Sequence, residues 1–251
     1  MEMTMAGIFF IYGIILGSFF NVVGLRVPKK ESIVSLPSHC TICDQKIGVI
    51  DLIPVFSYII LKGKCRGCGS KISFIYPLME ILTGGLFVLS YLMLGIGAEL
   101  IVAIMFMSLL VIITVSDIAY MLIPDKVLLP FAIALCGIRI LIPLNPWWDS
   151  ILGALIGFGV LYFIAFVSKG GMGGGDIKLF FVIGLVLGTV NTLLTLVLAA
   201  FIGSIVGIII LKKTGQGRKT PVPFGPSISL AAAISYFLGA DFVEWYVTMF
   251  L

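Results

Sequence analysis

The chain has 251 residues, of which 60% are hydrophobic and 11% are charged, and its mean hydropathy is +1.21. This composition excludes an ordinary soluble globular domain and indicates an integral membrane protein. The net charge of +4 gives no reason to expect nucleic acid as a partner, and we attribute it to membrane topology and contact with anionic membrane lipids.

Apolar runs recur along nearly the whole chain, each close to the roughly 20 residues that a helix needs to cross a bilayer. They predict an all-α polytopic membrane protein with about eight transmembrane helices. A turn around residues 188–191 divides the nearly uncharged run 177–211, and without that turn the count is seven. The expected spans are 5–23, 76–96, 98–116, 127–143, 149–168, 177–189, 190–211 and 226–250.

The distribution of Lys and Arg supports eight spans. On that topology, 15 of the 16 Lys and Arg residues fall in loops on one side of the membrane, and Arg139 lies near the far end of the fourth span. The positive-inside rule then places these loops in the cytoplasm and both termini outside. Seven spans would move the basic cluster at 212–219 to the opposite side. The loops are 24–75, 117–126, 169–178 and 212–225.

The segment 25–74 between the first two spans is the one region expected to leave the bilayer as a small insert. It holds two Cys-x-x-Cys pairs separated by 21 residues, namely Cys40, Cys43, Cys65 and Cys68. Four thiolates at this spacing suit a structural zinc ion. Gly67 and Gly69 would supply the backbone freedom of a tight turn. Two disulfides are the alternative, which a reducing cytoplasm disfavours.

His39 is the only histidine and adjoins Cys40. It is either a neighbour of the metal site or a substitute ligand, and we favour the former. A single histidine excludes a zinc protease of the His-Glu-x-x-His type and a Ser-His dyad within the membrane.

Two acidic residues stand at the cytoplasmic boundary of predicted spans, Asp117 at the end of the third and Asp176 at the start of the sixth. Ionisable groups at membrane depth are costly and point to function. Two facing carboxylates can cleave a peptide without histidine or metal, because one holds a proton while the other activates water. The glycines at 173–175 would let a substrate backbone approach Asp176.

The alternative to a catalytic role for these acidic residues is helix capping. Asp is a preferred N-cap residue, so Asp176 could cap the sixth span, and Asp125 after Pro124 could cap the fourth. For Asp117 the alternative is weaker, because the C-terminal end of a helix disfavours a negative charge.

At these residues the chain resembles the type IV prepilin peptidases, which are intramembrane aspartyl proteases of the Gly-x-Gly-Asp type. The resemblance covers almost the whole chain and includes both cysteine pairs, the aspartate motif Gly173–Asp176, and Ile123-Pro124-Asp125 after Asp117. Further matching stretches are Gly17–Pro28, Ile53–Tyr58 and Tyr76–Glu80.

The resemblance implies an enzyme of the bacterial cytoplasmic membrane. Members of the family cleave the basic leader from prepilins and pseudopilins after a glycine at the cytoplasmic face. Many then methylate the new N-terminal amine with S-adenosylmethionine. Asp117 and Asp176 would be the catalytic pair, whereas Asp125 would not be catalytic. Residues 1–24 would form the first transmembrane helix, 25–74 the methylation-associated insert, and 75–251 the peptidase core.

The site of the methyl donor is not visible as a motif, since the chain has no glycine-rich fingerprint of the Rossmann type. Asn21, Arg26 and Glu80 are the candidates for a polar site near the insert.

Three other functions stay open from the sequence. A transporter could use Asp117 and Asp176 as a proton or cation relay, although the two halves of the chain show no convincing repeat. Ser168 and Lys169 could form a Ser-Lys protease site, and the chain could be an inactive pilin-binding scaffold.

Overall fold

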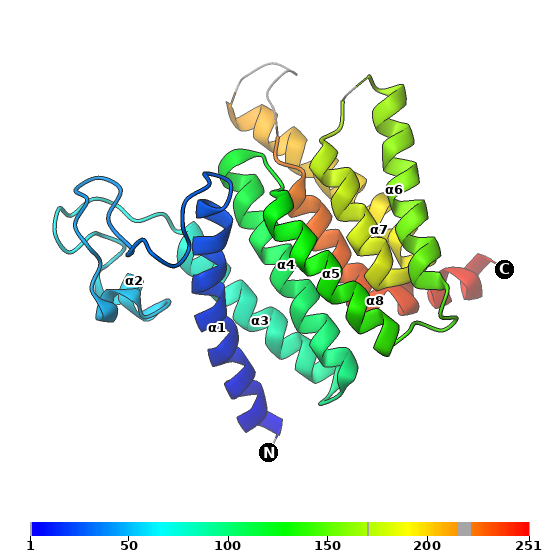
Figure 1. The fold of residues 1–251 in the computed structure, drawn as a ribbon, viewed down its shortest axis with the longest axis horizontal. Helices are drawn as coiled ribbons and strands as arrows, with labels where there is room; N and C mark the ends of the chain where they lie inside the picture. The colour runs from blue at the N-terminus through cyan, green and yellow to red at the C-terminus, as the bar shows by residue number, and fades with distance from the viewer. Residues whose placement is uncertain (1, 170, 215–221, 251) are drawn as a thin grey trace. The chain divides into compact units, whose positions relative to one another are not determined.

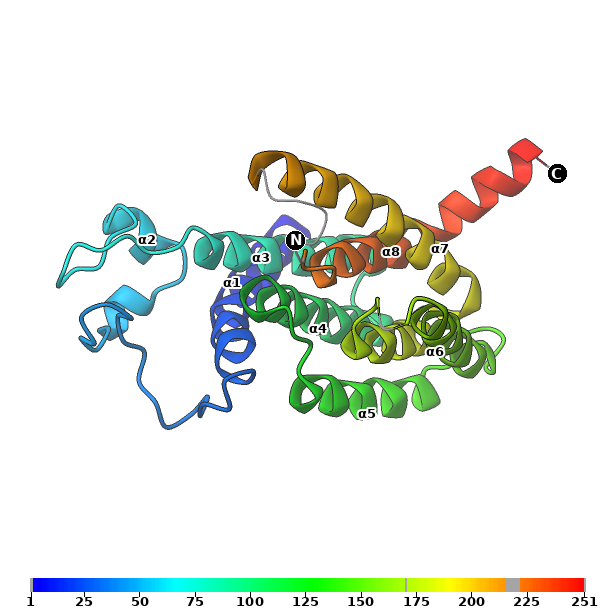
Figure 2. The same ribbon diagram turned by 90° about the horizontal axis from the view of Figure 1, so that it is seen from above.

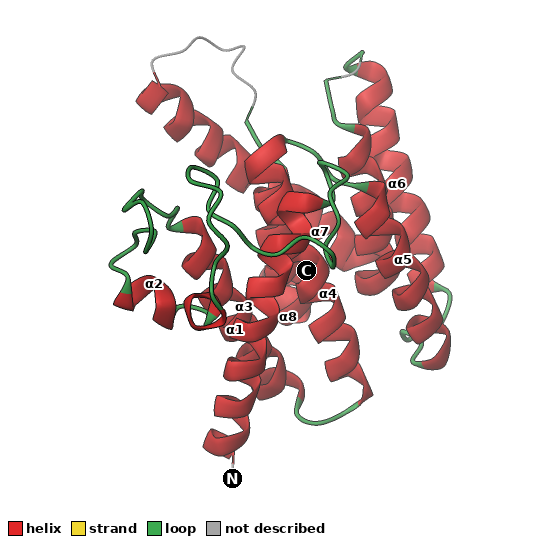
Figure 3. Cartoon of the chain, turned by 60° about the vertical axis from the view of Figure 1, so that its left-hand side comes forward, coloured by secondary structure: helices red, strands yellow, loops and turns green. Residues whose placement is uncertain are grey.

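The computed structural model describes residues 2–169, 171–214 and 222–250, and these residues are almost entirely helix and loop (Figure 3). Within them the only extended pairing consists of two isolated bridges. The chain forms two compact units, residues 1–115 and 116–251. Helix α4 (Ala98–Tyr120) begins in the first unit and ends in the second. The expectation of an all-α protein is therefore confirmed.

In the first unit, α1 (Glu2–Arg26) and α3 (Ile75–Leu94) lie side by side (Figure 1). Their backbones approach closely at Gly13, where an added Cβ would lie 2.6 Å from the Cα of Gly84. Small residues at such crossings are typical of membrane helices, because lipid provides no hydrophobic drive and close packing must hold the pair together.

The insert follows α1 and is made mainly of loops and turns. It contains the short helices η1 (Val49–Leu52) and α2 (Phe56–Ile60), neither long enough to cross a membrane. The sequence therefore correctly indicated that the segment between the first two long helices is not a span.

The described residues of the second unit form the end of α4 and four further helices, α5 (Asp125–Leu141), α6 (Asp149–Val167), α7 (Gly174–Thr214) and α8 (Gly225–Phe250). Helix α7 packs against α6 and α8 and also contacts α5 (Figure 2). The expected spans agree with the observed helices to within a few residues.

Helix α7 is broken at Gly188, whose φ of 75° and ψ of −176° are not helical. A straight helix of 41 residues would be about 60 Å long, roughly twice the hydrocarbon thickness of a bilayer. The turn expected at 188–191 is thus confirmed, and it divides α7 into residues 174–187 and 189–214.

Among the described residues, six helices are long and apolar enough to cross a membrane. Helix α5, with 17 residues, is not one of them, and α7 is counted once despite its break. The expected eight follows when α5 and both parts of α7 are included. Most of the basic cluster at 212–219 lies outside the described residues.

Helices α6 and α7 are in contact through glycines. A Cβ added to Gly153 of α6 would lie 2.5 Å from the carbonyl oxygen of Gly184, and one added to Gly157 would lie 2.6 Å from that of Phe180. These distances leave no room for a side chain, so the first part of α7 is closely held along α6.

Enlarging Gly153 should therefore destabilise the second unit. We expect Gly153→Leu to cost about 1–3 kcal/mol through overpacking, which thermal unfolding in detergent would report as a lower Tm. Gly159→Leu is the matched control on the same helix, because no atom lies within 4 Å of a Cβ at that position. Equal Tm values for the two variants would contradict the close contact between α6 and α7 at Gly153.

Candidate active site and metal centre

Asp117 lies in the last turn of α4 and is 6% exposed. Its Oδ2 accepts a hydrogen bond of 2.7 Å from the backbone N–H of Gly225, the first residue of α8. The carboxylate therefore lies at the positive end of α8, which offsets its unfavourable place at the end of α4. A Cβ on Gly225 would be 2.8 Å from Oδ2, so glycine is needed for this approach.

Gly225 is a site residue that the sequence reasoning missed. The available signal was Gly225-Pro226 directly before the last apolar run, since a proline near the start of a run is typical of a helix beginning. That pattern predicts where the helix begins. It does not predict that the first N–H of the helix binds Asp117, which lies 108 residues earlier in the chain.

Asp176 is the third residue of α7 and is half-buried. The backbone of Gly173 hydrogen-bonds to its carboxylate, which is one half of the capping-box arrangement. Asp176 is thus not the N-cap residue itself, as the capping alternative supposed, but reaches back from the first turn. A Cβ on Gly173 would lie 3.0 Å from Oδ2 of Asp176.

The two aspartates are close enough for the charge of Asp117 to act on the carboxyl of Asp176. The loop after α4 also contacts the start of α7, because a Cβ on Gly175 would lie 2.8 Å from the Cβ of Ile123. The structure therefore brings together the two residues that the sequence singled out, and the glycine before Asp176 permits the contact that does so.

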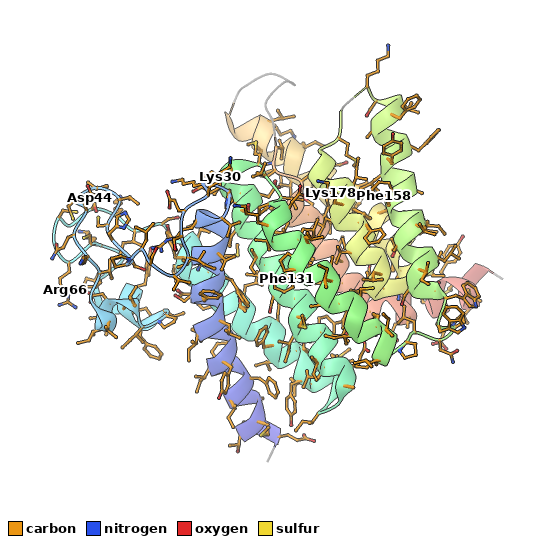
Figure 4. The ribbon with its side chains drawn as sticks, viewed as in Figure 1. Lys30, Asp44, Arg66, Phe131, Phe158 and Lys178 are labelled. Carbon is orange, nitrogen blue, oxygen red and sulfur yellow. The ribbon has the colours of Figure 1, made fainter. Side chains whose placement is uncertain are left out.

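Asp125 does not cap α5. It is the first residue of that helix, and Pro124 at the N-cap makes no side-chain hydrogen bond. Asp125 instead forms an ion pair with Lys178 of α7, with Nζ 2.8 Å from both carboxylate oxygens. Lys178 is labelled in Figure 4. The side chains of Lys178 and Asp125 are 52% and 65% exposed, so the pair contributes about 1 kcal/mol at most.

Ser168 and Lys169 do not form a catalytic arrangement in the structure. The Ser168 hydroxyl donates to the carbonyl of Ala165 and accepts from the N–H of Gly171, at 3.3 and 3.2 Å. Its role is to close the turn after α6.

The four cysteines of the insert gather into one cluster, with all Sγ atoms within 4.8 Å of one another. The Sγ atoms of Cys40 and Cys68 are 3.8 Å apart. Tetrahedral zinc with Zn–S bonds of about 2.3 Å places its sulfurs about 3.8 Å apart, so the donor set fits this ion. His39 is not in the cluster, and its Nδ1 lies 3.2 Å from the carbonyl oxygen of Pro37.

Both cysteine pairs lie in loops with the same hydrogen-bond pattern. The N–H of the first cysteine binds the carbonyl five residues later, and its own carbonyl accepts from the residue four later. That fourth residue, Asp44 or Gly69, has a φ of 54° or 70°. Gly69 therefore has the role expected of it. Gly67 has no positive φ, and the end of the flexible Gln45 side chain occupies the space of a Cβ at that position.

The pKa values of the thiols explain why this cluster would bind a cation. Backbone hydrogen bonds from Cys43 and Ile42 lower the pKa of Cys40 to about 6, which favours its thiolate. A backbone hydrogen bond from Gln45 acts to lower the pKa of Cys43, but burial and the other thiols together raise that pKa to about 11. Four thiolates cannot all form side by side unless a metal ion shares their charge.

The candidates for the methyl-donor site lie in the first unit. Glu80 is 7% exposed, and its carboxylate accepts from the N–H of Val55 at 2.7 Å and from the hydroxyl of Ser18. Val55 has a φ of 62°, which is strained for a β-branched residue. Asn21 donates to the carbonyl of Tyr76, while its buried Oδ1 has no hydrogen-bond partner among the described residues.

Arg26 has a different environment from Asn21 and Glu80. Its guanidinium donates to the carbonyls of Ser32 and Leu36, at 3.2 and 2.6 Å. It thereby fastens the first loop of the insert to the end of α1.

Two aspartates near helix ends in a polytopic helical protein are the arrangement expected of an intramembrane aspartic protease. Residues 104–208 match the type IV leader peptidase family, and residues 11–94 match the bacterial Peptidase A24 N-terminal domain. The chain belongs to the type IV leader peptidase family, and it is an integral membrane protein.

The chain is similar to curated proteins over nearly its full length. It is 40% identical to the prepilin leader peptidase/N-methyltransferase of Bacillus subtilis strain 168, over 98% of this chain and 100% of that protein. It is 33% identical to the enzyme of the same name from Xanthomonas campestris pv. campestris, over 94% and 92%. It is 33% identical to the type 4 prepilin-like proteins leader peptide-processing enzyme of Escherichia coli O78:H11, over 92% and 93%. No solved structure gave a significant match.

The cysteine cluster leads to a test of metal binding. Cys40→Ser or Cys65→Ser should reduce bound zinc from about one ion per chain to nearly none, because structural zinc requires four protein ligands. Elemental analysis of the purified protein measures the ratio. Cys136→Ser is the control, since that cysteine lies on α5 and outside the cluster. A zinc content equal in all three variants would exclude the four-thiolate site.

Proposed function

We propose that this protein is a prepilin leader peptidase that uses Asp117 and Asp176 to cut the leader from type IV prepilins and pseudopilins after a glycine. The observation that carries the proposal is that the end of α4 with Asp117 meets the start of α8 through Gly225, while the loop after α4 meets the start of α7, which carries Asp176. Membership of the family supplies the substrate class. The positive-inside distribution of Lys and Arg supports a cytoplasmic location for the site and the insert.

The reaction needs one carboxyl in the charged form and one in the protonated form, as expected for two acids in contact. The charged carboxylate takes a proton from a water molecule, whose oxygen then attacks the carbonyl carbon of the scissile bond. The other carboxyl gives its proton to the carbonyl oxygen. When the tetrahedral intermediate collapses, the carbon–nitrogen bond breaks and the nitrogen leaves as an amine with a proton from the first carboxyl. The second carboxylate takes a proton from one hydroxyl of the intermediate, so the new carboxyl group forms and both acids return to their starting states.

The surroundings of the two carboxyls suit this chemistry. The hydrogen bond from Gly225 uses Oδ2 of Asp117 and leaves Oδ1 for water or substrate. Two residues before Asp176, no atom of the described part of the chain lies within 4 Å of a Cβ placed on Gly174. An extended segment of the prepilin around its glycine would approach the start of α7 there.

Replacing either aspartate should abolish cleavage. We expect Asp117→Asn and Asp176→Asn each to lower the rate by roughly 10²–10⁴-fold or more, because an amide can act neither as base nor as acid. Mass spectrometry of a prepilin incubated with the purified protein in detergent measures loss of the leader. Asp241→Asn, an exposed acid on α8, is the matched control. Normal cleavage by either variant would remove the pair from the mechanism.

We further propose that the first unit carries the N-methylation activity, with Glu80 and Asn21 at its centre. S-adenosylmethionine supplies an electrophilic methyl group when bound. The buried Glu80 carboxylate and the unpartnered Oδ1 of Asn21 are acceptors, which suits a cationic ligand or an amine that carries protons. Glu80 would hold the new N-terminal amine and accept the proton that the amine loses when it gains a methyl group.

Glu80→Gln should separate the two activities. The variant keeps the size of the side chain but loses its charge, so we expect cleavage without the added methyl mass on the shortened pilin. Glu31→Gln, at an exposed position of the insert, is the control. Zinc content measured on the same sample shows whether the insert is still folded. Full methylation by the Glu80→Gln variant would contradict this assignment.

A further inference from the structure

The break in α7 leaves backbone groups without helical partners inside the apolar part of the chain. The expected topology places this break between the spans 177–189 and 190–211, beside the end of α5 and the start of α6. N–H and C=O groups that are buried there without a hydrogen-bond partner are costly unless the protein supplies one.

Two charged side chains supply those partners, one on each side of the break. Nη2 of Arg139, from the last turn of α5, donates to the carbonyl of Val186 at 2.8 Å. Oδ1 of Asp149, the first residue of α6, accepts from the N–H of Thr189 at 3.1 Å. A cation thus meets the C-terminal end of the first part of α7, and an anion meets the N-terminal end of the second, as the helix dipoles favour.

The three residues at the break in α7, Arg139, Asp149 and Gly188, depend on one another. Arg139 is only 5% exposed, and a buried charge is costly unless it is hydrogen-bonded. At Gly188 the positive φ is joined by the carboxylate of Asp149, which occupies the space that a Cβ would need. Glycine, arginine and aspartate are therefore matched to one another at the break.

The hydrogen bonds at the break also affect the other end of the first part of α7, where Asp176 lies. The first part of α7 carries Asp176 in its first turn and lies along α6 through Gly153 and Gly157. These glycine contacts hold the first part of α7 against α6. The hydrogen bonds of Arg139 and Asp149 add a second restraint at the C-terminal end of the same segment.

We infer that Arg139 and Asp149 are positioning residues for the catalytic pair: by holding the ends of the break at Gly188, they set where Asp176 lies relative to Asp117. The inference rests on the proposed peptidase function. A displacement of about 1 Å in a reacting group can cost about 10²-fold in rate. Losing either side chain would thus slow the chemical step, although neither touches the substrate.

The kinetic test compares Arg139→Met, Arg139→Lys and Asp149→Asn with the wild type on one prepilin. We expect Arg139→Met to lower kcat at least about tenfold with KM within about twofold, and Arg139→Lys to recover part of the loss, because it keeps a cationic donor. Asp241→Asn should match the wild type. A kcat that falls only in proportion to the folded fraction, or a change confined to KM, would overturn the inference.

A second measurement does not depend on activity. Hydrogen–deuterium exchange of residues 174–187 should be at least about tenfold faster in Arg139→Met than in the wild type, while α3 in the first unit should be unchanged. Unchanged exchange in 174–187 would overturn the positioning role even if cleavage were lost. If the wild type failed to cleave any prepilin but the exchange result held, the peptidase proposal alone would fail.

Discussion

A carboxylate at the edge of a lipid bilayer is stable only where the protein supplies the hydrogen bonds that water would otherwise give. In the second unit the backbone N–H of Gly225 meets this need for Asp117. The bond joins the end of α4 to the start of α8, and the contact between Ile123 and Gly175 joins the next loop to the start of α7. The ends of three helices therefore meet around one acid, and Asp176 enters the site because its helix begins there.

The three glycines before Asp176 have three different environments. Gly173 lies against the carboxylate that it hydrogen-bonds, Gly175 lies against Ile123, and Gly174 has open space beside it. Only the open space is consistent with the simple idea that glycines admit the substrate. The other two positions show that small size is also needed to let the acid and the neighbouring loop come close, which a general argument from flexibility does not reveal.

Much of the fold was predictable because its signals are local. Long apolar runs predicted the helices, the glycine at 188 predicted the break, and the Cys-x-x-Cys spacing predicted the cluster in the insert. The contacts of Gly225, Arg139 and Asp149 were not predictable, because each joins residues far apart in the sequence whose types are common at helix ends. Asp125 shows the same limit: its place after Pro124 suggested capping, but its side chain binds Lys178.

The matching loops of the insert have a consequence for how the chain is held together. Each loop offers two thiolates, too few for tetrahedral zinc, so one ion would have to join both loops. Such an ion closes a loop from Cys40 to Cys65 much as a covalent cross-link does, and it removes conformations from the unfolded chain. For a disulfide closing a loop of similar size this effect is worth about 3 kcal/mol. A zinc cross-link would give the insert comparable restraint under reducing conditions, where a disulfide would not persist.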